Sequence, residues 1–203
     1  MYNFFSPILY TMSSKRDRTR IKILQAALNR LAKPHDPARL EDIAADAGVT
    51  RQTLYLHFTS RGGLLIALVA YMDEINDLGT YIDEIRALTD PVEIIERMLK
   101  LTVAYEPKIH GVAMALTRLA SFDPDAAAAL EDRMQLRRAG FTEILGAIEK
   151  QGKLRSGWTT RQVSDVLWEA SAPSSYDHLV IERGWSAKTY ERWLLHLARS
   201  FLA

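Results

Sequence analysis

A glycine between two short helical stretches is the feature that most restricts how this chain folds. Residues 40–47 place apolar side chains at helical spacing, and residues 51–58 do the same after a short break. Gly48 provides the positive φ that closes the first helix, and Thr50 is a suitable N-cap for the second. The stretch predicts two helices joined by a tight turn, with a polar face on the second helix. That face carries Arg51, Gln52, Thr53, Tyr55 and His57.

Two helices in this arrangement have the form of a helix-turn-helix, whose second helix lies in the DNA major groove. Gln52 and Thr53 fall in the first turn of the second helix, where the glutamine amide suits adenine and the threonine methyl suits thymine. Tyr55 and His57 are expected to contact phosphate or sugar, which positions the helix without reading sequence. The expected DNA contacts, with the three arginines as phosphate ligands, are Arg39, Thr50, Arg51, Gln52, Thr53, Tyr55, His57 and Arg61.

The charge of the chain is divided unevenly between its ends. Residues 1–65 hold ten Lys and Arg against five Asp and Glu, whereas residues 66–203 hold 16 against 20. A basic end suits a polyanion such as DNA, although a chance excess on a solvated face is the alternative. Cysteine is absent, which excludes disulfides and thiolate metal sites and is compatible with a cytoplasmic location. No metal site or cofactor is predicted.

Nearly every segment follows the helical period, and no stretch alternates for long with period two. We therefore expect an all-α fold of about nine helices. Residues 1–11 lack the features of a signal peptide, and Met12 offers an alternative translation start. No later stretch reaches the roughly 18 apolar residues that a membrane span needs, so no membrane partner is expected.

Capping residues and prolines predict where individual helices begin and end. Thr19 is expected to cap the first helix, and Ser60 a long helix that continues through Leu78 as a rigid connector. Pro107 is expected to break a helix, because proline lacks the backbone N–H. Ser186 is expected to cap the last helix.

The turn and the second helix also resemble one protein family. Ala47-Gly48-Val49, Thr53-Leu54-Tyr55, His57-Phe58 and the basic Arg61 together make residues 18–70 similar to TetR-family transcriptional regulators. Two departures are the segment 33–37, where the family usually has a glycine-containing loop, and Arg39, where a Ser or Thr cap is more usual.

The resemblance implies an N-terminal three-helix DNA-binding unit and a C-terminal helical domain that binds an effector and dimerises. Accordingly, residues 1–17 are expected to be an extension, 18–63 the DNA-binding domain, and 64–203 the effector-binding and dimerisation domain. The last two main helices, near residues 163–170 and 190–202, would form a homodimer that binds a palindromic double-stranded operator. Family regulators mostly repress, and a small-molecule effector releases them from DNA.

Aromatic, Met and polar residues in the C-terminal part are candidates for the effector site, although such a stripe is also typical of plain core. His110 and Arg118 lie eight residues apart and are expected to share one helix face as a polar anchor. The candidate effector contacts are Met98, Tyr105, His110, Met114, Arg118, Phe141, Trp168 and Tyr176.

Two other classes of protein compete with a sequence-specific regulator. An enzyme or carrier built on a helical bundle would need a compact set of acids, bases or ligands, but the five histidines are scattered and no catalytic motif is present. No catalytic residue is therefore predicted. A sequence-blind nucleoid-type binder would use dispersed basic charge without a reading helix. Tyr55 can also be interpreted as a packing residue beside Leu54 and Phe58, and His57 as a structural histidine whose hydrogen bonds are satisfied within the fold. Arg51 and Gln52 can also be interpreted as solvated surface residues.

Overall fold

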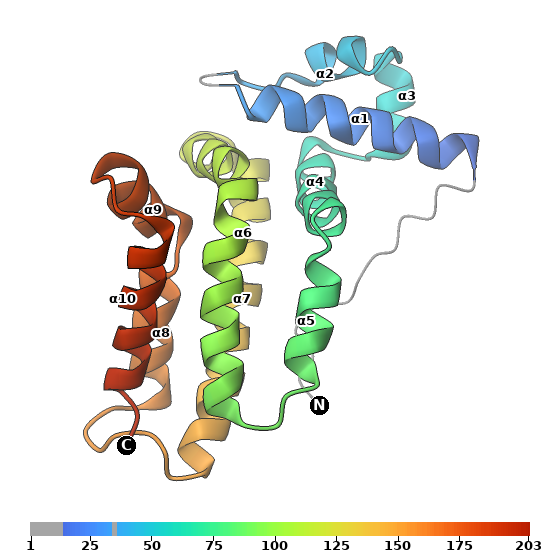
Figure 1. Ribbon diagram of the computed structural model, residues 1–203. Helices are drawn as coiled ribbons and strands as arrows, with labels where there is room; N and C mark the ends of the chain where they lie inside the picture. The colour runs from blue at the N-terminus through green and yellow to red at the C-terminus, as the bar shows by residue number, and fades with distance from the viewer. Residues whose placement is uncertain (1–13, 34–35) are drawn as a thin grey trace. The chain divides into compact units, whose positions relative to one another are not determined.

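The computed structural model describes residues 14–33 and 36–203, so the predicted start at Met12 and most of the predicted extension lie outside it. The described residues contain no strand, only an isolated bridge between Leu154 and Leu202, which confirms the all-α prediction. The helices (Figure 1) are α1 Lys15–Leu31, α2 Leu40–Asp46, α3 Arg51–His57, α4 Arg61–Ile75, α5 Leu78–Arg86, α6 Pro91–Ala120, α7 Pro124–Lys150, α8 Thr160–Ala170, α9 Pro173–Tyr176, the π-helical segment η1 Asp177–Glu182, and α10 Ala187–Ser200.

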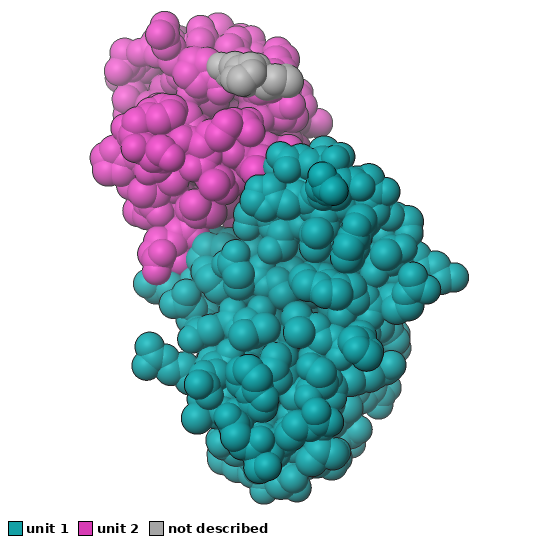
Figure 2. Space-filling view, turned by 90° about the vertical axis from the view of Figure 1, so that its left-hand side faces the viewer, with its two compact units in different colours: residues 1–6, 79–110, 133–203 teal, residues 7–78, 111–132 magenta. Residues whose placement is uncertain are grey.

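The described residues form two compact units, shown in magenta and teal in Figure 2. The N-terminal unit lies within residues 7–78 and 111–132, and the C-terminal unit includes residues 79–110 and 133–203. Packing thus assigns the middle of the chain, around the turn between α6 and α7, to the unit that holds the predicted helix-turn-helix. The division of roles expected at residue 63 stays a prediction.

The N-terminal unit is built around apolar faces of its first four helices. Helix α1 packs on both α2 and α4, and α2 packs on α3. Arg30 fastens α1 to α2, because its Nε and Nη2 donate to the two carboxylate oxygens of Asp46 at 2.7 and 3.1 Å. The fully buried side chains of this core include Ile23, Leu24, Leu31, Leu54, Leu64 and Leu68.

Helix α1 begins earlier than the sequence interpretation placed it. Ser14, not Thr19, is the N-cap: its Oγ accepts from the backbone N–H of Asp17 at 3.1 Å, and the Asp17 carboxylate accepts from the backbone N–H of Ser14 at 3.0 Å. Thr19 instead donates its hydroxyl to the carbonyl of Lys15 inside the helix. The reciprocal capping box, with an acid three residues after a serine, stabilises the earlier start.

The long connector predicted from Ser60 through Leu78 is wrong beyond Ile75. Ser60 does cap the helix, since its Oγ accepts from the backbone N–H of Gly63 at 3.0 Å, but α4 ends at Ile75. Asn76 donates its side-chain amide to the carbonyl of Met72 at 2.8 Å, and Asp77 follows with φ 55°. Asn and Asp tolerate this left-handed conformation, so the chain turns and starts α5.

The break predicted at Pro107 is also wrong. Helix α6 runs continuously through Pro107, which removes one backbone hydrogen bond and costs roughly 3 kcal/mol in a helix interior. Val103 before the proline and Val112 after it are both 4% exposed. Burial of the apolar face on both sides of the proline offsets the cost, and the helix continues.

The C-terminal unit ends in two helices that run side by side, α8 and α10 (Figure 1). Thr159 caps α8 in a reciprocal box with Gln162, and Ser186 caps α10 as the sequence predicts. The buried face between these helices includes Val163, Leu167, Tyr190 and Leu194. Within the described residues no single helix is long and apolar enough to cross a membrane; α3 and α4 meet that test only as a pair bent by 65°.

Candidate nucleic-acid interface

The turn between α2 and α3 has the geometry that the sequence predicts. Gly48 has φ 66°, and the next residue, Val49, donates its N–H back to the carbonyl of Ala44 at 2.9 Å. Thr50 then caps α3, because its Oγ1 accepts from the backbone N–H of Thr53 at 3.1 Å. The turn and the cap together fix the direction in which α3 leaves α2.

Helix α3 keeps one face in the core and presents the other to solvent. Leu54 is fully buried, whereas Arg51 and Gln52 are exposed and Tyr55 is 39% exposed. Thr53 is half-buried, and its hydroxyl lies 2.9 Å from the hydroxyl of Thr50. Gln52 thus presents an exposed side-chain amide in the first turn of α3. The hydroxyl of Thr53 already has a partner, so the methyl group of Thr53 is the part of that side chain available to contact a base.

The C-terminal end of α3 is fastened to α1. Arg20 donates through Nη1 to the carbonyl of His57 at 2.8 Å, and its guanidinium carbon lies 4.3 Å from the centre of the Phe58 ring. The carbonyls at a helix end have no partner within the helix, so an arginine donor there satisfies one of them. Helix α3 is held at both ends, which suits a surface that must present side chains in fixed positions.

His57 is half-buried at this junction rather than fully exposed. Burial lowers the pKa of His57 below its ordinary value, and the nearby charges of Arg16 and Arg20 lower it further. The imidazole is therefore mainly neutral near pH 7, and it can offer one N–H donor to a phosphate.

Arg51 already has partners in the free protein. Its Nη1 lies 2.8 Å from Oε1 of Glu41 on α2, and its Nη2 donates to the hydroxyl of Tyr55 at 3.4 Å. The Arg51 and Glu41 side chains are both 58% exposed, so solvent screens the pair and it contributes little to stability. The pair orients the guanidinium on the α2–α3 surface, and Glu41 competes with any phosphate for it.

Arg61 and Arg39 lie in very different surroundings. Arg61 bonds to the carbonyl of Pro37 at 2.9 Å and forms an ion pair with Asp123 at 3.0 Å, and its side chain is only 26% exposed. Arg39 is exposed, and it precedes α2 without capping it. The geometry therefore leaves Arg39 open to a phosphate but gives Arg61 structural partners.

Sequence reasoning missed two further features of this surface. Leu56 on α3 is 71% exposed, an apolar side chain beside the polar ones. The start of α1 exposes a group of four basic side chains within eight residues of sequence. This basic run consists of Lys15, Arg16, Arg18 and Lys22. It lies close enough to α3 for the charge of Arg16 to lower the pKa of His57.

The eight candidate effector contacts are divided between the two units. Met114 and Arg118 belong to the N-terminal unit, whereas the others belong to the C-terminal unit, and Phe141 is only 2% exposed within the core. His110 and Tyr176 do lie together, with ring centres 5.5 Å apart. The guanidinium carbon of Arg138 lies 4.4 Å from the centre of the Trp168 ring. Tyr105 lines a groove between α5 and α6.

His110 belongs to a cluster of charged groups inside the C-terminal unit. Its Nε2 lies 2.8 Å from Oδ1 of Asp177 on η1, and its Nδ1 lies 3.5 Å from Oε1 of Glu106, one turn earlier on α6. Glu106 is only 3% exposed. Arg137 of α7 donates to the carbonyl of Ser171 at 2.6 Å. The cluster thus joins α6 and α7 to the segment that connects α8 with α10.

Burial controls the protonation of this cluster. Desolvation raises the pKa of Glu106, and the positive charges of Arg137 and His110 oppose the rise. Desolvation lowers the pKa of Arg137 to about 10, and the charge of Glu106 opposes that change. Burial also raises the pKa of Tyr190, whose hydroxyl donates to the carbonyl of Ala170 at 2.6 Å.

Known proteins match most of this chain. Residues 23–68 match the family model of bacterial regulatory proteins, tetR family. The HTH-type transcriptional repressor LfrR of Mycolicibacterium smegmatis is 36% identical over 167 residues, which are 77% of this chain and 77% of that protein. The nucleoid occlusion factor SlmA of Marinomonas sp. is 28% identical over 144 residues, or 70% of this chain and 68% of that protein.

Solved structures share the fold over nearly the whole chain. NalD, the secondary repressor of the MexAB-OprM multidrug efflux pump in Pseudomonas aeruginosa, has a TM-score of 0.70 at 20% identity, over 94% of this chain and 98% of that one. The fatty acid degradation regulator FadR from Bacillus halodurans has a TM-score of 0.69 at 20% identity, over 90% of this chain and 99% of that one.

Proposed function

Since this chain belongs to the TetR family of transcriptional regulators, we propose that it is a repressor that binds a palindromic operator through α3 and is released by a small-molecule effector. The observation that carries the proposal is the exposed face of α3, whose ends are fixed by the Thr50 cap and by the Arg20 bond to His57. A relative 36% identical bears the name of a transcriptional repressor, which supports repression. A cytoplasmic location is part of this proposal, because a bacterial regulator must reach the DNA.

In this proposal Gln52 reads sequence and the surrounding side chains set the position of α3. The amide of Gln52 can donate to and accept from adenine in the major groove. Thr53, through its methyl group, and Leu56 suit the methyl group of thymine. Phosphate and sugar contacts come from Arg39, Thr50, Arg51, Tyr55, His57 and the basic run at the start of α1.

A second copy of the chain would pack against α8 and α10. The two helices lie together, and Val166, Trp193 and Leu197 on them are only half-buried in a single chain. Two-fold pairing of these faces would place two copies of α3 on two half-sites, and the operator would then be an inverted repeat. In this division of roles, residues 18–63 bind DNA and residues 64–203 bind the effector and the second copy.

Selection of bound duplexes from a random DNA pool tests the proposal, with sedimentation of the free protein at micromolar concentration alongside. We expect one enriched inverted repeat and a sedimenting dimer. Retention of all sequences with equal affinity would contradict the proposal and favour the sequence-blind binder. A monomer that binds a single half-site would contradict the dimer.

A further inference from the structure

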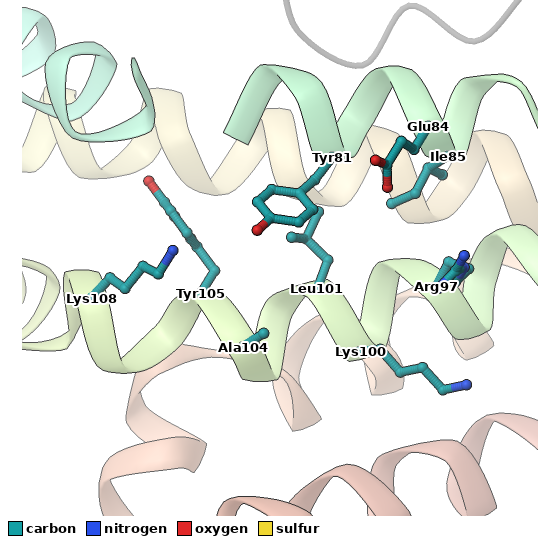
Figure 3. Close-up of a pocket in the computed structure, with 9 residues that line it drawn as sticks. All are labelled: Tyr81, Glu84, Ile85, Arg97, Lys100, Leu101, Ala104, Tyr105 and Lys108. Carbon is teal, nitrogen blue, oxygen red and sulfur yellow. The ribbon is translucent and has the colours of Figure 1, made fainter. Parts of the chain in front are cut away.

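Helices α5 and α6 of the C-terminal unit flank a groove with a volume of about 210 Å³ (Figure 3). Its floor is aromatic and apolar. Ile85 and Tyr105 are each 7% exposed, Leu101 is half-buried, and Tyr81 of α5 is 45% exposed at the rim. Figure 3 shows the ring of Tyr81 extending from α5 toward α6, over Leu101. Two tyrosine rings thus line a surface on which a flat apolar group can lie.

Cations outnumber acids around this floor. Arg97, Lys100 and Lys108 come from α6, and Glu84 of α5 is the one acid among the lining residues. Figure 3 shows Arg97 at the end of the groove that also holds Glu84, and Lys108 beside Tyr105 at the other end. Lys100 extends away from the groove. The Lys108 end is therefore positive without a neighbouring acid in the groove.

The ammonium group of Lys108 has no polar partner among the described residues. Two other cations of the C-terminal unit do have partners: Lys153 pairs with Asp90 at 3.0 Å, and Arg199 pairs with Glu96 at 2.6 Å. In the part of the chain that the structure describes, no hydrogen bond or ion pair involves Lys108. A lysine placed at the end of an aromatic groove, with no internal partner, is available to an anion from outside.

We propose that this groove binds a small aromatic carboxylate, whose ring lies against Tyr81 and Tyr105 and whose carboxylate meets Lys108. The volume of about 210 Å³ exceeds the roughly 150 Å³ of a cavity that accepts benzene, so one or two fused rings fit. The excess of positive charge disfavours a cationic ligand, and a bare phosphate leaves the aromatic floor unused. A ligand of this size binds with a Kd on the order of 0.1 to 1 mM.

The ligand's role as the effector rests on the proposed function, whereas its binding to the groove does not. The first experiment therefore uses the full chain without DNA and titrates it with 2-naphthoate, followed by calorimetry or ligand-observed NMR. The matched probes are the neutral 2-naphthamide and the cationic 2-naphthylmethylammonium. We expect naphthoate to bind about tenfold or more tightly than either, because only its carboxylate forms a hydrogen-bonded ion pair with Lys108.

Variants assign that binding to the groove. Lys108→Ala is expected to weaken naphthoate binding about tenfold, and Tyr81→Ala to weaken it for all three probes. Lys188→Ala, which removes an exposed lysine of the same unit that does not line the groove, is the control and is expected to change the affinity less than twofold. Lys108→Glu should reverse the preference toward the ammonium probe. Equal binding of the three probes, no binding of naphthoate at 5 mM, or equal losses in Lys108→Ala and Lys188→Ala would each overturn the proposal.

A second experiment measures operator binding in the presence of naphthoate, and it distinguishes failure of this inference from failure of the proposed function. Saturating naphthoate is expected to weaken binding of the selected operator by the wild type and to leave the Lys108→Ala variant unaffected. Naphthoate that binds the groove but leaves operator affinity unchanged contradicts its role as the effector. If the random pool yields no operator at all, the proposed function fails, yet the titration without DNA still decides whether the groove binds the carboxylate.

Discussion

Arg61 and Asp123 form an ion pair within the N-terminal unit, with 3.0 Å between Nη1 and Oδ2. Arg61 begins α4 directly after the loop that follows α3, and Asp123 lies in the turn between α6 and α7. The other oxygen of Asp123 accepts from the backbone N–H groups of Asp125 and Ala126 at 3.0 and 3.2 Å, so it caps α7. One carboxylate thus holds the start of α4 and the start of α7 together.

A double-mutant cycle measures this pair. Asp123→Asn removes the charge but keeps a capping oxygen, and Arg61→Met removes the guanidinium but keeps an apolar stem. The Arg61 and Asp123 side chains are 26% and 13% exposed, so we expect a coupling free energy of about 1 kcal/mol in urea unfolding, above that of an exposed pair. Additive effects of the two substitutions would show that the pair contributes nothing.

The same pair bears on the predicted phosphate contact of Arg61. Because Asp123 and the carbonyl of Pro37 already hold the guanidinium, we expect Arg61→Met to lower stability and to leave the salt dependence of DNA affinity nearly unchanged. Arg39→Met, which removes an exposed arginine, should reduce the slope of log K against log salt by about 1. A slope that falls for Arg61→Met and not for Arg39→Met would reverse these assignments.

Glu41 is expected to restrain DNA binding. In the free protein it pairs with Arg51 at 2.8 Å, so a phosphate must displace it. Glu41→Gln should therefore raise affinity for all DNA sequences and make the salt slope steeper by about 1. Fluorescence anisotropy of a labelled duplex across a series of NaCl concentrations measures both quantities. The control is Glu143→Gln, an exposed acid of the C-terminal unit; an equal gain there would indicate only a change in net charge.

The start of α1 provides a direct test of the corrected helix boundary. Ser14→Ala removes the side-chain acceptor of the capping box and is expected to lower the free energy of unfolding by about 1 kcal/mol. Thr19→Ala removes a hydroxyl that donates to a carbonyl within the helix, and we expect a change below about 0.5 kcal/mol. Denaturant unfolding of both variants measures the loss in the free energy of unfolding for each. A larger loss for Thr19→Ala would restore the later start.

Buried Glu106 predicts a pH dependence of stability. Its pKa is raised from the ordinary 4.5 by burial, so between 4.5 and the raised value the folded chain holds a proton that the unfolded chain has lost. The free energy of unfolding contributed by this group therefore falls as pH rises through that window. Glu106→Gln does not titrate, so its stability relative to the wild type should increase from pH 4.5 upward and then level off.

Thermal or urea unfolding of the wild type and of Glu106→Gln between pH 4 and 6.5 measures this difference in stability. His110, Arg137 and Arg133 lie near Glu106 in both proteins, so comparison of wild type and variant removes much of what these neighbours contribute to the pH dependence of stability. A relative stability of Glu106→Gln that decreases with pH would mean that Arg137 and His110 stabilise the carboxylate more than burial penalises it.

Local signals explain why the helix-turn-helix could be predicted from the sequence. Gly48 and Thr50 act on backbone groups only a few residues away, so their roles follow from residue type and position. Gln52 is exposed as expected because Leu54, two positions later, must point into the core. The same local reasoning places the cap of α10 at Ser186.

Among the wrong predictions of helix boundaries, one arose because packing outweighed a local rule and another because a different residue formed the stronger cap. Pro107 remains within α6 because burial on both sides of it offsets the lost hydrogen bond. Ser14 outcompetes Thr19 through its box with Asp17. Other contacts could not be predicted at all, because the partners of Arg61 and His110 lie far away in the sequence, at Asp123 and at Asp177 in η1, and no local pattern indicates them.

Whether α3 reads DNA sequence through Gln52 is tested most directly by one ratio: the affinity for the selected operator divided by the affinity for a scrambled duplex at the same salt concentration. A good bidentate base contact contributes about 1 to 3 kcal/mol of discrimination, so Gln52→Ala should lower this ratio by roughly five- to 150-fold while scrambled-duplex affinity stays the same. Gln25→Ala, an exposed glutamine of α1, is the matched control and should leave the ratio unchanged. An unchanged ratio in Gln52→Ala, with both affinities reduced equally, would contradict sequence reading through Gln52.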